Sequence, residues 1–324
     1  MRAVCFSLLV LSLAGCGGPT ASGEAPEVLD GPFSLNLAAT DTLEVAPGAT
    51  FLIGAHALDA GVVRRFTSSN PNVATLARYA GNGDDGWALI GYFATLTARS
   101  PGLATLSAAY ADRSASFALR VREPASLRLD ETGRCGLTEW GELWCRGSNS
   151  LGELAARTPE SKCFRPCGLQ ASPAWVHGAR GFAFRAITSG SAHSCGIAIA
   201  DSRAYCWGLN HENSVGSEVL HRRLGGPLAG RLDFGCRMSP DALYAPAACS
   251  FAPVAVDRAL DRALVFRTIK AIGAVTCGTT GAPGEPEERW CWGDGPVPTQ
   301  RTEFPSGFPA TLATRSADGL AIEE

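Results

Sequence analysis

The chain has 324 residues, 18% of them charged, and a formal net charge of −3. Lysine occurs only at Lys162 and Lys270, and no basic block or basic amphipathic segment is present, which disfavours nucleic acid as a partner. The 37 glycines and 20 prolines, with few segments of helical period, favour an all-β chain rich in turns.

The chain begins with a short apolar run that ends at a cysteine. Arg2 precedes the run over residues 3–13, which is too short to span a bilayer and is typical of a signal-peptide core. The following Leu-Ala-Gly-Cys, ending at Cys16, resembles the lipobox of bacterial lipoproteins. The resemblance implies cleavage before Cys16 and several acyl chains on that residue, which suffice for stable anchoring. An ordinary signal peptide with an incidental cysteine is the alternative.

Residues 17–32 follow this predicted signal segment, residues 1–16, and are expected to be a flexible tether. Gly, Pro, Ser and Ala dominate its first part, so little bulk is available to bury a core. Beyond the tether, no uninterrupted apolar run is long enough to cross a membrane. We therefore expect a bacterial cell-envelope location. Gly17, rather than an aspartate, follows Cys16 and favours the outer membrane or cell surface.

Residues 33–122 alternate between apolar and polar side chains, as half-buried strands do. Turn signals such as Pro47-Gly48 and Pro101-Gly102 separate the runs, which together predict a β-sandwich. The predicted strands are Phe33–Leu37, Thr42–Val45, Thr50–Ile53, Ala94–Thr97, Ala104–Ser107 and Ser116–Val121.

Two segments of this region resemble bacterial Ig-like domains of group 2. Residues 66–76 are similar to that family's core motif, with Phe66 in place of the usual tryptophan, and residues 98–106 are similar to a second family segment. Residues 79–92 are longer than the usual connection. The resemblance implies a rigid spacer of a surface protein, with direct ligand or carbohydrate binding as the alternative. The acidic stretch 81–86 lacks the ordered spacing of a Ca²⁺ loop and favours a polar hairpin turn.

The cysteines divide the chain sharply. Of 12 cysteines, Cys5 lies in the segment to be removed and Cys16 is the expected lipid site, which leaves ten, all after residue 130. An even number in an exported chain predicts disulfides. The change in composition predicts a domain boundary between residues 33–122 and residues 124–324.

Residues 124–324 repeat one pattern three times. An apolar residue stands eight places before a Cys-Gly pair, and each repeat closes with aromatic-Cys-x-Gly. The pattern predicts a hairpin with one cysteine on each strand, because opposed residues of paired strands lie within reach of a disulfide. The predicted pairs are Cys135–Cys145, Cys195–Cys206 and Cys277–Cys291; the other four pair most simply as Cys163–Cys167 and Cys236–Cys249. A metal at Cys163 and Cys167 is the rival, but no second ligand pair stands out.

This pattern resembles the regulator of chromosome condensation repeat in its cysteine-rich exported form, most closely over residues 193–210. The resemblance implies a β-propeller. The family ring usually has about seven blades, whereas this chain carries three repeats, so we expect a partial propeller of about three blades. An open fan leaves edge strands, which makes self-association a hypothesis. A ring completed by a partner and a fragment or decayed paralogue are alternatives. Residues 305–324 are a candidate closing strand.

Nothing in the sequence forms a recognisable catalytic constellation. The histidines are His56, His177, His193, His211 and His221, and none has the helical spacing of a metal motif. His193-Ser194-Cys195 suggests a nucleophile, but Cys195 falls in the disulfide register. Trp140 and Trp175 are candidate binding anchors or turn-packing residues.

We therefore expect a non-enzymatic protein-binding module without cofactor or metal, in which the Ig-like region is the spacer. The alternative is an inhibitor or regulator of an extracytoplasmic enzyme, by analogy with a propeller relative that blocks β-lactamases. A hydrolase on a propeller scaffold ranks third.

Overall fold

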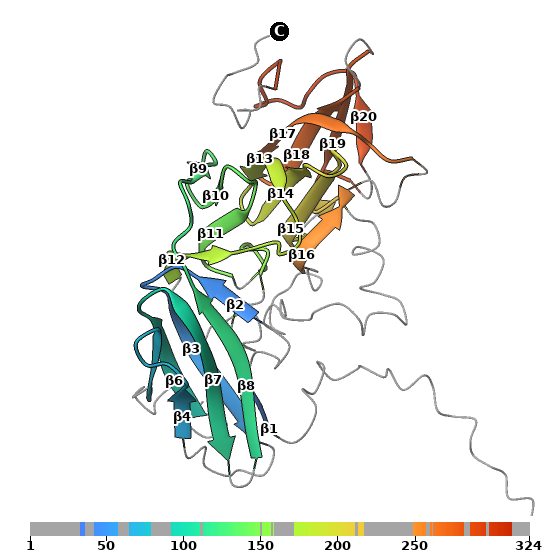
Figure 1. Ribbon diagram of the computed structural model, residues 1–324. Helices are drawn as coiled ribbons and strands as arrows, with labels where there is room; N and C mark the ends of the chain where they lie inside the picture. The colour runs from blue at the N-terminus through green and yellow to red at the C-terminus, as the bar shows by residue number, and fades with distance from the viewer. Residues whose placement is uncertain are drawn as a thin grey trace, which may run out of the picture.

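In a computed structural model of the protein, the described residues are 33–35, 42–57, 65–78, 92–110, 113–149, 151–156, 158, 172–210, 213–216, 249–256, 260, 262–281, 286–295 and 298–312. Within these ranges the chain is all-β, as predicted, with four sheets and no α-helix. Figure 1 shows the strands following one another from the lower end of the molecule, in blue and green, to β17–β20 at the upper end.

The N-terminal strands form a β-sandwich. One sheet has the order β1-β3-β6-β5, and β4-β7-β8-β2 lie side by side in the other. Their apolar faces share one core, which includes Phe51 and Leu96 from the first sheet and Phe117 and Leu119 from the second. The strands are β1 Phe33–Leu35, β2 Thr42–Val45, β3 Thr50–Ala57, β4 Arg65–Ser68, β5 Ala74–Arg78, β6 Tyr92–Ala98, β7 Gly102–Tyr110 and β8 Arg113–Val121.

The remaining strands form three four-stranded antiparallel units in chain order, which we call blades one, two and three. Blade one consists of β9 Arg128–Leu129, β10 Cys135–Leu137, β11 Leu143–Gly147 and β12 Ser172–His177. Blade two consists of β13 Phe184–Ser189, β14 His193–Ala198, β15 Ala204–Leu209 and β16 Cys249–Ala255. Blade three consists of β17 Phe266–Ile272, β18 Val275–Thr280, β19 Glu288–Trp292 and β20 Thr299–Arg301. Each sequence repeat thus supplies the middle strands of one blade.

A disulfide joins the two middle strands of every blade. Cys135 lies opposite Cys145, Cys195 opposite Cys206 and Cys277 opposite Cys291, and each pair is bonded with Cα atoms 4.0–4.1 Å apart. These are the three hairpin pairs that the sequence predicts. In the chain-entropy model each closes a short loop and stabilises the fold by roughly 2–3 kcal/mol.

The other predicted pairs fall largely outside the described residues. Cys249, at the start of β16, is disulfide-bonded, and its predicted partner Cys236 lies outside the described part of the chain. Cys163 and Cys167 lie outside it as well.

In blades two and three the glycine of the Cys-Gly pair leaves room for an aromatic ring, whereas Gly136 of blade one faces Leu127 and Leu129. A methyl group on Gly196 would lie 2.6 Å from the Phe184 ring, and one on Gly278 would lie 2.7 Å from the Phe266 ring. Phe184 and Phe266 begin the first strands of blades two and three and are fully buried. The Cys-Gly signature therefore encodes two contacts at once, a covalent one across the hairpin and a packing one to the neighbouring strand.

Hydrogen bonds tie each blade to the next at equivalent places. The Phe184 amide donates to Gly141 O over 2.9 Å, and the Phe266 amide donates to Ser202 O over 2.8 Å. Gly141 and Ser202 lie in the turns between the cysteine-bearing strands of blades one and two. Side chains add to this repeat, because Arg128 Nη2 donates to Arg185 O over 3.0 Å and the Arg185 guanidinium donates to Phe266 O. The blades therefore stack in order with a repeated geometry.

The sandwich and blade one share a sheet. Val176 of β12 pairs with Val45 of β2, so that one eight-stranded sheet runs β4-β7-β8-β2-β12-β11-β10-β9. One apolar cluster also extends from the sandwich through blade one to Phe184 and Trp207 of blade two. The predicted division between residues 33–122 and 124–324 remains a prediction. In the structure, the two regions are continuous in backbone pairing and in core.

The prediction of a closing strand in residues 305–324 is wrong for residues 305–312, the part of this segment that the structure describes. The strand that closes blade three is β20, and residues 302–312 form turns and irregular backbone. Two proline residues, Pro305 and Pro309, deprive this segment of the amide donors that a strand would need.

Candidate functional site

Exposed apolar side chains gather at one end of the blades. Trp140 is 72% exposed, Ile199 52% and Val265 51%. Trp140 and Ile199 lie in the turns between the cysteine-bearing strands of blades one and two, and Val265 precedes the first strand of blade three. We call these three residues the apolar rim.

The segments that carry the three rim residues contact one another from blade to blade. A methyl group on Gly141, beside Trp140, would lie 2.9 Å from Ile199 Cδ1, so the two turns touch. The turn that carries Ile199 also contacts blade three, because Ser202 O in that turn accepts a hydrogen bond from the amide of Phe266, the residue after Val265. Exposed apolar side chains brought to neighbouring segments in this way are candidates for an interaction surface.

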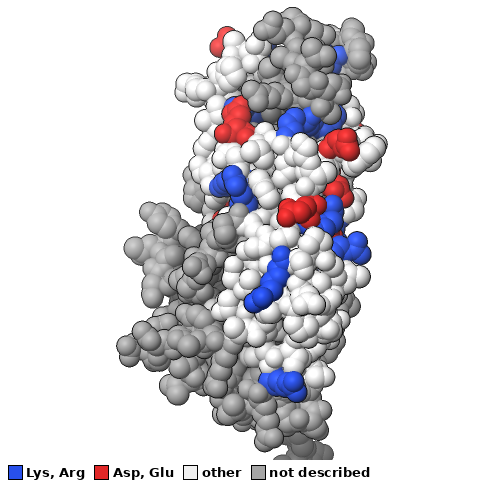
Figure 2. Space-filling view, turned by 60° about the vertical axis from the view of Figure 1, so that its left-hand side comes forward, with Lys and Arg blue, Asp and Glu red and all other residues white. Residues whose placement is uncertain are grey.

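The charged side chains around the blades form no field of a single sign on the face shown in Figure 2, where acidic and basic residues alternate. Several of them pair, as Arg262 does with Glu288 at 2.7 Å and Arg301 does with Asp294. Such a surface offers no continuous positive track for a phosphate backbone.

The second tryptophan singled out from the sequence lies elsewhere. Trp175 is part of β12 rather than of a turn, and the Arg146 guanidinium lies 4.7 Å above its ring. Arg146 stands where repeats two and three have the buried Trp207 and Trp292. In blade one the arginine instead covers Trp175, which makes Trp175 a packing residue and leaves Trp140 as the exposed one.

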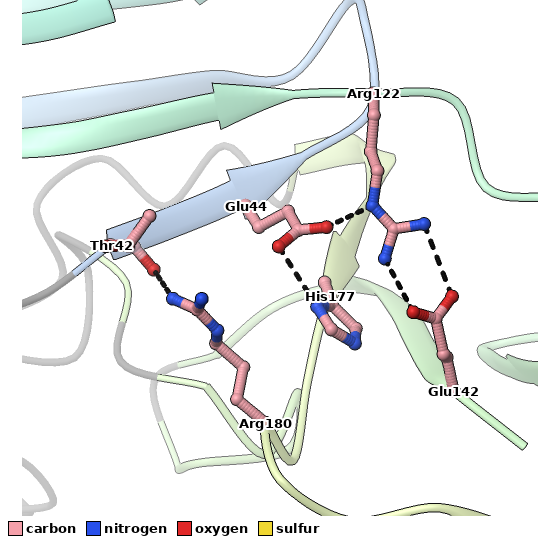
Figure 3. A network of polar contacts seen from close by, with 6 residues as sticks. All are labelled: Thr42, Glu44, Arg122, Glu142, His177 and Arg180. Atoms are coloured by element: carbon pink, nitrogen blue, oxygen red, sulfur yellow. Dashed lines mark hydrogen bonds and ion pairs between the residues drawn. The ribbon is translucent and has the colours of Figure 1, made fainter. Parts of the chain in front are cut away.

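A network of charged residues joins the sandwich to blade one (Figure 3). Arg122, which follows β8, binds Glu44 of β2 through Nε and Glu142 of blade one through both terminal nitrogens, at 2.9 and 3.2 Å. His177 Nδ1 lies 3.4 Å from the second carboxylate oxygen of Glu44. Nearby, Arg180 Nη1 donates to Thr42 O over 2.9 Å. We call Glu44, Arg122, Glu142 and His177 the junction network.

Aromatic contacts cover the same place. The Trp144 ring is fully buried, stacks on the His177 ring at 5.1 Å and lies 4.7 Å below the Arg122 guanidinium. Burial alone would raise the pKa of Glu44, but the bonds and charges of His177 and Arg122 outweigh it and lower the pKa to about 2. Glu44 is therefore a charged group with only 5% of its surface exposed, held by partners from both regions.

His193 lies at the interface of blades two and three. Its Nε2 atom is 2.7 Å from Thr276 Oγ1 of β18, and the ring lines a cavity of about 140 Å³ together with Ser191, Ala192, Leu209, Ser214 and Ala274. Burial, helped by the Arg134 charge, lowers the pKa of His193 to about 4, so the imidazole is neutral near pH 7. Ser194 is only 1% exposed and Cys195 is bonded to Cys206, so the triplet 193–195 presents no accessible nucleophile.

The described residues contain no group of three or more His, Cys, Asp or Glu side chains placed to hold a metal ion. They also contain no helix that is long and apolar enough to cross a membrane. The expected lipid site Cys16, His211 and His221 lie outside the described residues, as do the acidic stretch 81–86 and the side chain of His56.

No family model and no curated protein matches the chain. Among solved structures, domains 4 and 5 of the S-layer protein SbsC match at 18% identity and a TM-score of 0.23, over 28% of this chain and less than half (44%) of that one. Human WBSCR16 matches at 12% identity and a TM-score of 0.36, over 84% of this chain and 57% of that one. The WD40 ectodomain of the Arabidopsis thaliana receptor kinase ACR4 matches at 13% identity and a TM-score of 0.22, over 83% and 98%.

Likenesses this slight assign no function. The chain is defined by its own architecture, which is an all-β protein with a sandwich and three disulfide-joined blades that share one continuous sheet at their junction.

Proposed function

We propose that the chain is a non-enzymatic, exported binding protein that is anchored to the bacterial envelope through lipid on Cys16 and contacts a protein partner through the apolar rim. The exposed side chains of Trp140, Ile199 and Val265 carry the proposal. Tryptophan is strongly enriched among interface anchors, and two further exposed apolar side chains, Ile199 and Val265, stand on the segments of the next two blades. The resemblances of residues 33–122 to bacterial Ig-like domains and of residues 124–324 to propeller repeats support the same function.

A protein partner fits the chemistry of this surface better than a charged polymer does. The apolar rim offers apolar area for a protein contact. The mixed charges on the face of Figure 2 offer no field of a single sign that would attract a charged polymer. The polar groups that would do chemistry are enclosed, since His193 and Thr276 are 1% and 0% exposed.

Replacing the rim is expected to weaken binding of the partner. The mature chain, immobilised, would be used to capture proteins from envelope extracts of its own bacterium, and the dissociation constant of the captured protein would be measured. The variant carrying Trp140→Ser, Ile199→Ser and Val265→Ser should bind at least about 10-fold more weakly, because a central apolar anchor contributes about 2 kcal/mol.

Leu103→Ser is the matched control, since Leu103 is 62% exposed but lies on the sandwich. It should leave the affinity unchanged. A rim variant that binds as the wild type does, or a wild-type chain that captures no protein, contradicts the proposal.

The anchor has its own test. In a lipoprotein-processing bacterium, Cys16→Ser should move the chain from the detergent phase to the aqueous phase and remove the mass of the acyl chains, because the acylated sulfur is lost. Cys5→Ser should change neither property, since Cys5 lies in the segment that is removed. An unmodified amino terminus on the wild-type chain would exclude the anchor and leave the rim proposal untouched.

A further inference from the structure

The two faces of each blade are different, and the disulfide marks one of them. In blade two, Cys195 and Cys206 pack with Phe266 and Ile269 of blade three. Cys195 Sγ lies 3.7 Å from Thr276 Oγ1, and the Ala271 amide donates to Thr188 Oγ1 over 2.9 Å. The disulfide face of blade two is therefore the face on which the next blade sits.

In blade one the disulfide face is also turned to the next blade. Trp144 of β11 faces Arg122 and the sandwich, so its neighbour Cys145 points to the opposite side of the strand. Cys135 and Cys145 belong to an apolar cluster that contains Phe184 of blade two. Phe184 and Phe266 occupy the same place in their repeats, at the start of the first strand. Two successive interfaces thus place the aromatic first strand of the following blade on the disulfide face of the preceding one.

Blade three carries the same face, but a different element covers it. Cys277 and Cys291 are fully buried and cluster with Leu312, against which Val275, Phe304 and Phe308 pack. The Phe304 and Phe308 rings stack at 6.2 Å. Apolar side chains from residues 302–312 therefore occupy the position that blade two and blade three take on the earlier disulfide faces.

Polar contacts fix this segment to blade three. Arg289 of β19 donates through Nη1 to Thr302 O over 2.8 Å, and its guanidinium lies 5.4 Å from the Phe304 ring. The Phe308 amide donates to Pro305 O over 3.1 Å, which closes the turn between the two rings. The segment is thus held both by its aromatic side chains and by its backbone.

The opposite end of the array is also covered. Trp144 lies on the face of blade one that is turned away from blade two, and Arg122, Glu44 and the sandwich bury it. The three blades are accordingly enclosed between the sandwich and residues 302–312.

We propose that residues 302–312 are a terminal cap that stands in for a fourth blade, so that the three-blade array ends within this chain and does not recruit a further blade. Stacked repeats need such caps because an uncovered inner face is apolar and adhesive. Without the cap, we expect the apolar disulfide face of blade three to be buried against the same face of a second copy of this chain, since a contact between two identical faces closes as a dimer.

The test compares the full mature chain with two cap variants. One variant ends at Arg301, and the other is full length with Phe304→Ser, Phe308→Ser and Leu312→Ser. Sedimentation velocity at micromolar concentration and binding of the dye ANS would be measured on each. The wild type should be a monomer with little dye binding, and both variants should dimerise and bind ANS several-fold more strongly.

Ser306→Ala with Thr311→Ala is the matched control, because both residues lie in the same segment with exposed side chains. It should behave as the wild type does. A synthetic peptide of residues 302–312 added to the truncated chain should return it to the monomer, which shows that the truncated chain has kept its fold. Cap variants that stay monomeric without added dye binding overturn the proposal, as does a wild-type chain that already associates through blade three.

Discussion

Arg122→Met is expected to lower the free energy of unfolding by about 3 kcal/mol, because it leaves the Glu44 carboxylate buried without its cationic partner. Methionine keeps an apolar side chain over Trp144, so the loss reports the charge rather than the packing. Only 5% of Glu44 is exposed, and water cannot replace the missing guanidinium. Urea unfolding of the mature chain under oxidising conditions measures the change.

The chain offers a matched control for this variant. Arg262 also pairs with a glutamate, Glu288, and also lies over a tryptophan ring, Trp290, but its side chain is 57% exposed. Arg262→Met should cost less than about 1 kcal/mol, as exposed ion pairs do. Adding Glu44→Gln to Arg122→Met should recover part of the loss, since the buried charge is then removed. Equal losses for Arg122→Met and Arg262→Met would show that the junction network does not hold the two regions together.

The junction network bears on the proposed function because it fixes how the blades are presented. A spacer on a flexible link would let the rim sample many orientations, whereas a shared sheet and the partly buried junction network favour one. Binding to a partner then loses less conformational entropy.

The second large effect that we expect is a loss of stability as the pH falls from 6.5 towards 4, and this loss should be absent from the His193→Gln variant. The pKa of His193 is about 4 in the folded chain, against about 6.5 in the unfolded chain. Between these values the unfolded state binds the proton and the folded state does not, so stability is complete above pH 6.5 and falls as the pH is lowered towards 4. The difference amounts to about 3 kcal/mol for this single group.

The measurement is the free energy of unfolding at several pH values from 7 to 4 for the wild type and for His193→Gln, whose amide can keep a hydrogen bond to Thr276. The difference between the two curves isolates His193 from other groups that titrate in the same range, such as Glu153, whose pKa burial raises. We expect the wild-type curve to fall more steeply through this window. If the wild-type and His193→Gln curves are parallel, the pKa of His193 is the same in the folded and unfolded chains, which contradicts the prediction. Protonation of Glu44 should lower the stability further at more acidic pH, as the pH falls through 4.5 towards 2.

The blade hairpins could be predicted from sequence because their signals are local. The cysteine spacings of 10, 11 and 14 residues define pairs that lie opposite each other on adjacent strands, and these pairs are bonded in the structure. The apolar alternation of Thr42–Val45 and Ser116–Val121 similarly predicts strands that the structure contains. The same alternation predicts that the Glu44 side chain faces solvent. This prediction is wrong, because blade one covers the face of the sheet that an isolated sandwich would expose, and Glu44 is buried.

The sequence by itself determined the all-β class, the number of repeats and the pairing of the hairpin cysteines, since each depends on residues close together in the chain. It left Trp140 and Trp175 as equal candidates for an exposed anchor, and the structure exposes Trp140. Only the tertiary structure decided that the sandwich and blade one share a sheet, that Glu44 and Arg122 meet Glu142, and that residues 302–312 cover the last disulfide face. These contacts join separate strands and segments, and the charged side chains among them are ordinary surface residues when taken alone. Their burial follows from how whole sheets pack, a property that no local pattern of residues carries.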